Sequence, residues 1–382
     1  MVISRKLLLA SSFLSAAVLG GCEHSSTSNE RVTGECRLTL SRCSSRQAVV
    51  SLTDAEQAAL TPRQERSFAG APRRAVMVSA DAALTALGFA PVRSHDAAAV
   101  VEAESSKILA SRWQRSLRAL TNGGLIGGED HSWTTALLIF DDQDAAVRVR
   151  VELNQTVWDS HGNSKSRIVD DPALYDEVFD HLAQQLAAPV AQTGTAPVAG
   201  STVAEAVAHQ GALRRIGGCE AGGVYRCSSM QEIQDPSPAE DAALAGLSVH
   251  PYPGLLPDQV EARVRKSLTE MGFQAVAATS AGVLRGEINA DQATRDQRRW
   301  RALGAMALGQ ATGLAGNTLL RAEPDHSTIN AVATIARMGS GSVVWVNFRY
   351  TVWDSKGDAK TVTLTDAPLF AEFWERAGPG PS

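Results

Sequence analysis

Two identical tripeptides, Asp-His-Ser, occupy residues 130–132 and 325–327. These are the residue types of the acyl-transfer triad, in which a histidine activates a serine and an acid orients the histidine. A triad is assembled from separate parts of a chain, whereas neighbouring residues of a strand point in different directions. The nucleophile motif G-x-S-x-G is also missing from the sequence. We therefore interpret both tripeptides as polar strand starts, assign no catalytic residue, and expect His131 and His326 to contribute little to stability.

Other motifs of catalytic, metal or cofactor sites are missing too. The histidines follow no H-E-x-x-H pattern, and the glycines at 123–128 lack the Lys-Ser/Thr of a phosphate-binding loop. Carboxylates are plentiful, but none are marked by the sequence as an acid–base pair. We predict no cofactor and no metal. Trp158 and Trp353 are expected to be packing residues, with a ligand platform as the alternative.

Cys22 is the next residue with distinctive chemistry, and it follows a leader-like segment. Arg5 and Lys6 precede an uncharged run at 7–19. This run is too short to span a bilayer as a helix, but it suits the core of a signal peptide. The residues that follow, Leu19-Gly20-Gly21-Cys22, resemble the lipobox of bacterial lipoproteins.

That resemblance implies cleavage of the chain before Cys22 and lipidation of Cys22 itself. A plain secretory signal with an incidental cysteine is the alternative. Residue 23 is Glu rather than the Asp that retains such proteins in the inner membrane, so the resemblance favours the periplasmic face of the outer membrane. Residues 23–33 are polar and are expected to form an unfolded tether.

Four further cysteines form two close pairs, Cys36 with Cys43 and Cys219 with Cys227. An exported protein reaches an oxidising compartment, where such pairs close as disulfides. A zinc site is the alternative, but the pairs lie in different halves of the chain and their spacing matches no zinc ribbon or knuckle. We expect disulfides, with pairing inside each half favoured over pairing between halves.

The chain carries the same ordered set of motifs twice, which predicts a tandem repeat. LTALGF (84–89) returns as LTEMGF (268–273), and TVWDSHGN (156–163) returns as TVWDSKGD (351–358). The stretch between the repeats is rich in Ala, Pro, Gly and Thr, which is typical of a linker. The predicted organisation is a signal peptide at 1–21, lipidated Cys22 and tether at 22–33, a first repeat at 34–187, a linker at 188–216, a second repeat at 217–378 and a tail at 379–382.

Two helices are predicted in each repeat. The first is expected to start at Ser79 in one repeat and at Asp258 in the other, and to end at Gly88 and Gly272, because glycine takes the left-handed conformation without penalty. The last helix of the first repeat opens at Asp171-Pro172, a cap residue followed by a first-turn proline. Its buried face is predicted to hold Leu174, Tyr175, Val178, Phe179 and Leu182.

Antiparallel strands are predicted between these helices. In AVRVRVEL (146–153) the valines alternate with Arg148, Arg150 and Glu152, which indicates a strand with one buried and one wet face. Residues 344–352 repeat the pattern. The predicted fold class is α+β, with two tandem domains, each an antiparallel sheet packed by an N-terminal and a C-terminal helix.

The order of motifs LxxLGF, Val-rich strand, V-W-x-x-x-G and D-P-x-x-Y resembles a family of uncharacterised bacterial lipoproteins. It is more distantly similar to the helix-grip domains of envelope assembly-factor lipoproteins such as BamC. The resemblance covers most of both repeats and implies a helix-grip-like fold in the cell envelope. Its motifs are structural, so it implies no enzymatic activity.

Residues 302–320 are uncharged and follow Arg298, Arg299 and Arg301. The length would admit a membrane span, but the glycines, Gln310 and Asn317 oppose stable insertion. We favour an excursion on the globule and keep contact with a bilayer or partner as the alternative. The side chains for such a contact are Leu303, Met306, Leu308, Leu314 and Leu319.

The charge of the chain narrows the class of partner. The net charge is −5, and no long basic stripe is present, which disfavours nucleic acid. We predict a membrane-anchored periplasmic lipoprotein that presents two similar domains to an envelope protein partner or a lipid, since duplicated surfaces suit bivalent binding. The alternative is a hydrolase-like enzyme with a site between the two copies.

The anchor is tested by replacing Cys22. Cys22→Ser removes the thiol that would carry the lipid, so the variant is expected in the soluble fraction after cell disruption. A clickable fatty-acid analogue should label the wild type and not the variant. Equal membrane retention of both proteins with no label in either would contradict the lipid anchor.

Overall fold

The computed structural model describes residues 29–33, 46–109, 129–159, 162–188, 211–217, 229–279, 281–289, 324–354 and 357–378. All five cysteines and the 302–320 segment lie outside these ranges. Lipidation, the disulfides and the proposed membrane contact therefore stay predictions.

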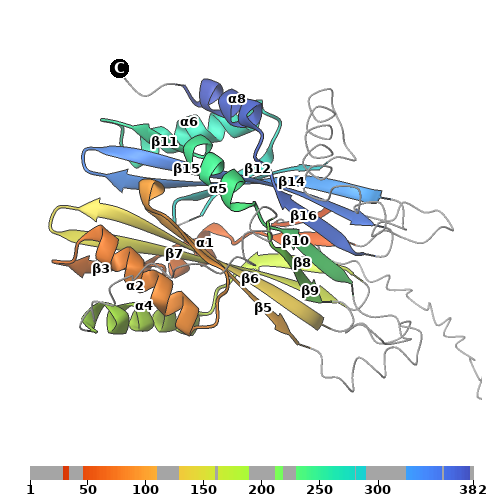
Figure 1. The fold of residues 1–382 in the computed structure, drawn as a ribbon, viewed down its shortest axis with the longest axis horizontal. Helices are drawn as coiled ribbons and strands as arrows, with labels where there is room; N and C mark the ends of the chain where they lie inside the picture. Colours follow the sequence, from red (N-terminus) through yellow and green to blue (C-terminus); the bar gives the residue numbers. More distant parts are fainter. Residues whose placement is uncertain are drawn as a thin grey trace, which may run out of the picture.

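The protein is an α+β structure of four layers, with two sheets face to face and helices outside (Figure 1). Helices α2 (Arg73–Ala86) and α4 (Pro172–Ala187) pack on the outer face of the first sheet. Helices α6 (Pro257–Glu270) and α8 (Ala367–Ala377) pack on the outer face of the second. The α+β class predicted from the sequence is confirmed.

The first sheet is formed by residues up to 168, and we call the chain up to 188 the first half. Its strands run in the order β1 (Glu30–Thr33), β2 (Gln47–Val50), β8 (Ser164–Ile168), β7 (Ala146–Asp159), β6 (Glu129–Gln143), β5 (Val100–Ile108) and β4 (Val92–His95). Strand β3 (Glu65–Ala69) pairs with the remaining length of β7.

The second sheet, in the half that begins at 211, has the same order of strands. It runs β9 (Leu213–Gly217), β10 (Met230–Gln234), β16 (Ala359–Thr363), β15 (Gly341–Asp354), β14 (Pro324–Met338), β13 (Val283–Asn289) and β12 (Gln274–Ala278), with β11 (Val249–Tyr252) on β15. This correspondence is compatible with the predicted repeat. One expectation needs correction: β2 pairs with β8, and β10 with β16, in parallel, so the sheets are mixed. Parallel neighbours require a long crossover, which local sequence patterns do not reveal.

The predicted antiparallel strands and glycine helix ends are confirmed. β6 pairs with β7 and β14 with β15 across their short turns. Gly88 and Gly272, just after α2 and α6, have φ of +83° and +90°. Helix α2, however, begins at Arg73 rather than near Ser79, because Pro72 forms its N-cap position.

Helix α4 begins as predicted, with the Asp171 carboxylate accepting a hydrogen bond from the Ala173 N–H. Tyr175, Val178, Phe179 and Leu182 are buried on it. Leu174 was predicted on the same face but is 42 % exposed, since it lies about 100° around the helix from Tyr175.

Two helices were missed from the sequence. They are α1 (Asp54–Leu60) and α5 (Pro238–Leu247). Two short 3₁₀ turns are also present: η1 (Thr61–Arg63) follows α1, and η2 (Asp96–Ala98) precedes β5. Both helices begin with a capping box, formed by Thr53 with Glu56 and by Ser237 with Glu240. The S/T-x-x-E spacing was a sequence signal that could have located them.

The predicted tether and linker also need correction at their ends. Strand β1 lies inside the 22–33 stretch expected to be unfolded, and β9 lies mostly inside the 188–216 linker. Both are short polar edge strands, which carry no hydrophobic pattern. They are ordered by backbone pairing with β2 and β10, respectively.

The two V-W-x-x-x-G turns meet each other between the sheets. A Cβ added to Gly162 would lie 2.7 Å from the Gly357 Cα, which is backbone that cannot swing away. Gln47 and Gln231 donate to the carbonyls of Gly162 and Gly357, at 3.3 and 3.5 Å. Matching residues of the two halves therefore touch across a local pseudo-twofold relation, as in an isologous interface.

This contact predicts unequal effects of two similar substitutions. Gly162→Ala and Gly88→Ala both place a Cβ on a left-handed residue, with φ of +85° and +83°, at a cost of about 1–2 kcal/mol. Nothing lies within 4 Å of the added Cβ at Gly88, so it serves as the control. Gly162→Ala must also separate the turns, so chemical denaturation should show the larger loss of stability for it. Equal losses would contradict packing between the halves.

Candidate functional site: the polar seam between the sheets

The densest group of ionised side chains lies between the two sheets. We call the facing side chains of β5, β6 and β7, of β13, β14 and β15, and of β9 the polar seam. Arg148, Arg150 and Glu152 were expected to face water, but Arg150 and Glu152 are buried and contact the second half, whereas Arg148 keeps a side chain 30 % exposed. The correction has a simple cause, because alternation along a strand reports that its two faces differ, not what covers each one.

Arg150 makes the most buried connection across the seam. The side chain is 6 % exposed, and its Nε lies 2.7 Å from Asp141. Its Nη1 and Nη2 donate to the backbone carbonyls of Ala281 and Ile335, both at 2.6 Å. The Asp141 carboxylate in turn accepts the backbone N–H of Arg337 at 2.7 Å. One buried ion pair is thus hydrogen-bonded to the backbone of the opposite half at three points.

A second cluster surrounds Glu104, which is 1 % exposed. Its two carboxylate oxygens contact Arg349 at 3.0 Å and Arg214 at 2.6 Å. Glu102 also pairs with Arg349. The first half supplies the carboxylates of this cluster and the second half supplies these two guanidinium groups.

The electrostatics of this cluster follow from burial and pairing. Burial by itself raises the pKa of Glu104, but the guanidinium groups of Arg349 and Arg214 outweigh it, and the pKa lies below its usual value. Burial lowers the pKa of Arg349, while Glu102 and Glu104 raise it more, so the net shift is upward. Glu104, Arg349 and Arg214 are therefore ionised at neutral pH.

A third ion pair and an apolar patch complete the seam. Arg285 donates through Nε to the buried Glu152 at 2.8 Å. The imidazole of His95 lies 5.1 Å from the ring of Trp345. Ala281, Val283, Ala336, Val343 and Trp345 of the second half join the buried core of the first half. The two halves therefore share part of one core, where separate cores were expected.

The first Asp-His-Ser segment differs from expectation. Asp130 Oδ2 lies 3.0 Å from His131 Nδ1, although neighbouring strand residues were expected to point apart. The pairing of β6 with β7 shifts register between Glu129 and His131, and such a bulge turns successive side chains toward the same side. Ser132 has no part in this contact.

His131 has a packing role in the structure. It is 0 % exposed and stacks on Trp158 with ring centroids 4.9 Å apart. Strand β9 covers it, since a Cβ on Gly217 would lie 2.7 Å from the His131 Cε1. His131→Ala would remove a buried ring, contrary to the small effect on stability expected from the sequence.

His326 repeats the arrangement in the second half. It is buried and stacks on Trp353 with ring centroids 4.7 Å apart. Trp158 and Trp353 are themselves buried, as expected of packing residues.

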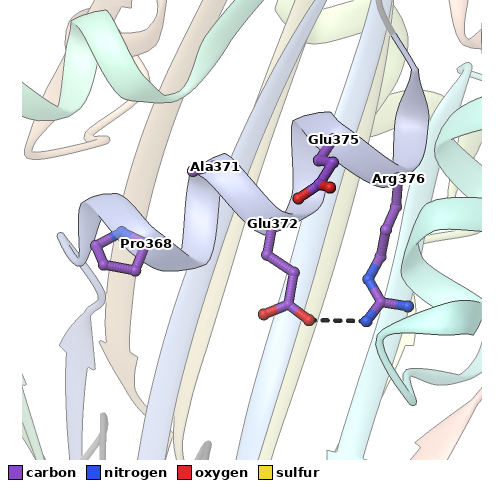
Figure 2. A pocket seen from close by; sticks show the side chains of 5 residues that line it. All are labelled: Pro368, Ala371, Glu372, Glu375 and Arg376. Atoms are coloured by element: carbon purple, nitrogen blue, oxygen red, sulfur yellow. Dashed lines mark hydrogen bonds and ion pairs between the residues drawn. The ribbon is translucent and has the colours of Figure 1, made fainter.

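A shallow hollow on the outer surface of α8 is lined by Pro368, Ala371, Glu372, Glu375 and Arg376 (Figure 2). All five residues come from one helix, and Glu372 pairs with Arg376 at 2.8 Å. The lining contains neither a nucleophile nor a histidine to activate one. It does not bring together groups from several elements, as a typical binding site does.

Two further searches bear on the predicted sites. Within the described ranges, no three His, Cys, Asp or Glu side chains are placed to hold a metal ion. No helix of the same ranges is long and apolar enough to cross a membrane. The predicted site residues, which are Cys22, the four paired cysteines and the leucines and methionine of 302–320, lie outside the described ranges.

The seam itself was not found from the sequence. Its acidic and basic residues stand on different strands in different halves, and only pairing registers place them opposite one another. One signal in the sequence was a difference in charge between the repeats. Glu102 stands two residues after Val100, whereas Arg285 stands two residues after Val283 on the matching strand.

Comparison with known proteins assigns no function to this chain. No family model matches the chain, and a search of curated proteins finds no match. The likeness to envelope lipoproteins rests on the motifs of the sequence.

The Glu104 cluster predicts a pH-dependent stability. Glu104→Gln removes a buried charge that two arginines pair with, at an expected cost of about 3 kcal/mol at pH 7. Because its folded pKa is lowered, ionised Glu104 stabilises the protein above its unfolded pKa of about 4.3, and this contribution is lost as pH falls through the lower folded value. Urea unfolding should show that the difference in the free energy of unfolding between wild type and variant narrows from about pH 5 to pH 3.

Asp176→Asn is the matched control. Asp176 pairs with Arg63 and Arg66 at 3.5 and 3.4 Å, but its side chain is 44 % exposed. The expected cost is at most about 1 kcal/mol. A loss of stability for Glu104→Gln that is as small as for Asp176→Asn, or that does not change with pH, would contradict stabilisation by ionised Glu104.

Proposed function

We propose that this protein is a lipid-anchored lipoprotein of the bacterial cell envelope with a structural or binding role. The observation that carries the proposal is the N-terminal pattern, in which Arg5 and Lys6, an uncharged core at 7–19 and Leu19-Gly20-Gly21 lead to Cys22. The protein faces the periplasm and is anchored to the outer membrane, because Glu23 rather than Asp follows Cys22. The oxidising compartment suits local disulfides between Cys36 and Cys43 and between Cys219 and Cys227.

The arrangement of charges supports binding rather than catalysis as the role. Glu102, Glu104 and Glu152 are paired with arginines of the other half, and Asp141 is paired with Arg150, which reaches the backbone of the other half. These charges therefore hold the halves together. A group that is to act as acid or base must instead reach its substrate.

The duplicated surfaces available to a partner are the outer helical layers. The sheet faces are covered by one another, which rules them out as the paired surfaces of a bivalent binder. Helices α2 and α4 lie on one side of the molecule and α6 and α8 on the other (Figure 1). We propose that an envelope protein binds these layers, with Leu303, Met306, Leu308, Leu314 and Leu319 as an additional contact to partner or bilayer.

A hydrolase-like enzyme is the second candidate, and one observation favours it. Asp130 is hydrogen-bonded to His131 Nδ1, which is how an acid orients a histidine base. The other ring nitrogen, Nε2, has no hydrogen-bond partner and is buried. Catalysis through it would require β9 to move away, since β9 covers the ring.

The binding role is tested by photo-crosslinking in intact envelopes. Val78 on α2 is 62 % exposed, and Ala262 is exposed on α6, so a photoreactive residue at either position leaves the fold intact. When Cys22 is native, we expect the probes at both positions to crosslink to the same envelope protein. Combining either with Cys22→Ser should abolish the crosslink, because the unanchored protein no longer meets its partner at the membrane.

Leu213, which is 43 % exposed on the edge strand β9, is the control position. Strand β9 pairs with β10 and belongs to neither helical layer, so this position should give no specific product. A specific crosslink from Leu213 alone, with none from Val78 or Ala262, would move the partner surface off the helices.

A further inference from the structure

Positions of the two sheets can be matched by their pairing registers. Asp130 and Asp325 begin the matching tripeptides of β6 and β14, so equivalent residues of these strands are 195 apart. Val100 pairs with Ile139, and Val283 pairs with Thr334, which is 195 residues after Ile139. Val100 and Val283 are therefore equivalent, and two residues on, Glu102 is equivalent to Arg285.

The seam residues differ in charge at these equivalent positions. The 195-residue offset makes Glu152 of β7 equivalent to Asn347 of β15, and Asn154 equivalent to Arg349. The first half thus presents Glu102 and Glu152 to the seam, where the second half presents Arg285 and Arg349. The ion pairs that form, Glu102 with Arg349 and Glu152 with Arg285, all join one half to the other.

Pairing of like halves would lose these ion pairs. In the same geometry, two first halves would place Glu152 against Glu102 and Glu102 against Asn154. Two second halves would place Arg285 against Arg349 and against Asn347. Like charges brought together in a buried seam cost far more than paired ones, so both arrangements are disfavoured.

We propose that the seam is a recognition surface by which the first half selects the second half of the chain and rejects a copy of itself. The occupant of each face is the opposite half, chosen by charge. Because linkage in one chain raises the effective concentration of that partner, the protein closes on itself instead of assembling with other chains.

Charge inversion in the full-length protein tests this. The basic variant carries Glu152→Lys, so that Arg285 of the second half meets a second cation. The acidic variant carries Arg285→Glu, so that Glu152 of the first half meets a second carboxylate. The combined variant carries both substitutions and restores this pair with its signs exchanged. Glu102 and Arg349 stay native because Arg349 also pairs with Glu104.

The measurements are thermal unfolding of each variant and native mass spectrometry of the basic and acidic variants expressed together. We expect the melting temperature to fall in the basic and acidic variants and to recover most of that loss in the combined variant. Co-expression should give a particle of one basic and one acidic chain, because each face then finds an opposite one only in the other chain.

Two results would overturn the proposal. One is a combined variant that is less stable than both parents, which would mean that the losses add and the charges do not recognise each other. The other is co-expression that gives only single chains or particles of a single variant. If the basic or the acidic variant fails to fold, the combined variant still tests the proposal. It contains every substitution, so it should fold only if the exchanged charges pair with each other.

The outer pair Arg66–Asp180, at 2.9 Å with side chains 36 % and 65 % exposed, controls for surface charge inversion. Arg66→Glu and Asp180→Lys should leave the melting temperature and the single-chain mass nearly unchanged, alone or together. A fall in these variants as large as in the seam variants would remove the specificity assigned to the seam.

Discussion

The pairing of buried charges between the two sheets is the constraint on which the rest of this structure depends. A carboxylate or guanidinium taken out of water costs several kcal/mol unless an opposite charge and hydrogen bonds replace the lost solvent. Arg150 meets this requirement with Asp141 and two carbonyls of the opposite half, and Glu104 meets it with two arginines. The sheets can therefore stack in few registers.

That constraint determines which surfaces serve function. The outer faces of both sheets are covered by amphipathic helices, and the inner faces cover each other. Within the described ranges, the surface left to the surroundings is therefore helix surface and sheet edges. An anchored binding protein requires no more than such a rigid body at the end of a tether, and the polar seam keeps the body in one arrangement instead of a mixture.

Much of the local structure could be predicted from the sequence, since local rules decide it. Asp171 and Pro172 begin α4, Gly88 and Gly272 follow the ends of their helices, and alternating valines form β7. Predictions were wrong where a distant partner decides. The polar face of β7 is buried by another sheet, Asp130 reaches His131 through a bulge, and β1 and β9 are ordered by strands they meet only after folding.

The sequence by itself determined the two main helices of each half, the alternating strands, the α+β class and the twofold recurrence of motifs, because these depend on periodicity, caps and glycines within a few residues. It also contains the leader-like pattern and Cys22 on which the proposed location rests. Only the tertiary structure decided that the polar faces meet, that Glu102 finds Arg349 and that Gly162 touches Gly357. The reason is physical: a charge in a strand has the same local pattern whether water or an opposite charge faces it, and only the packing of the sheets tells them apart.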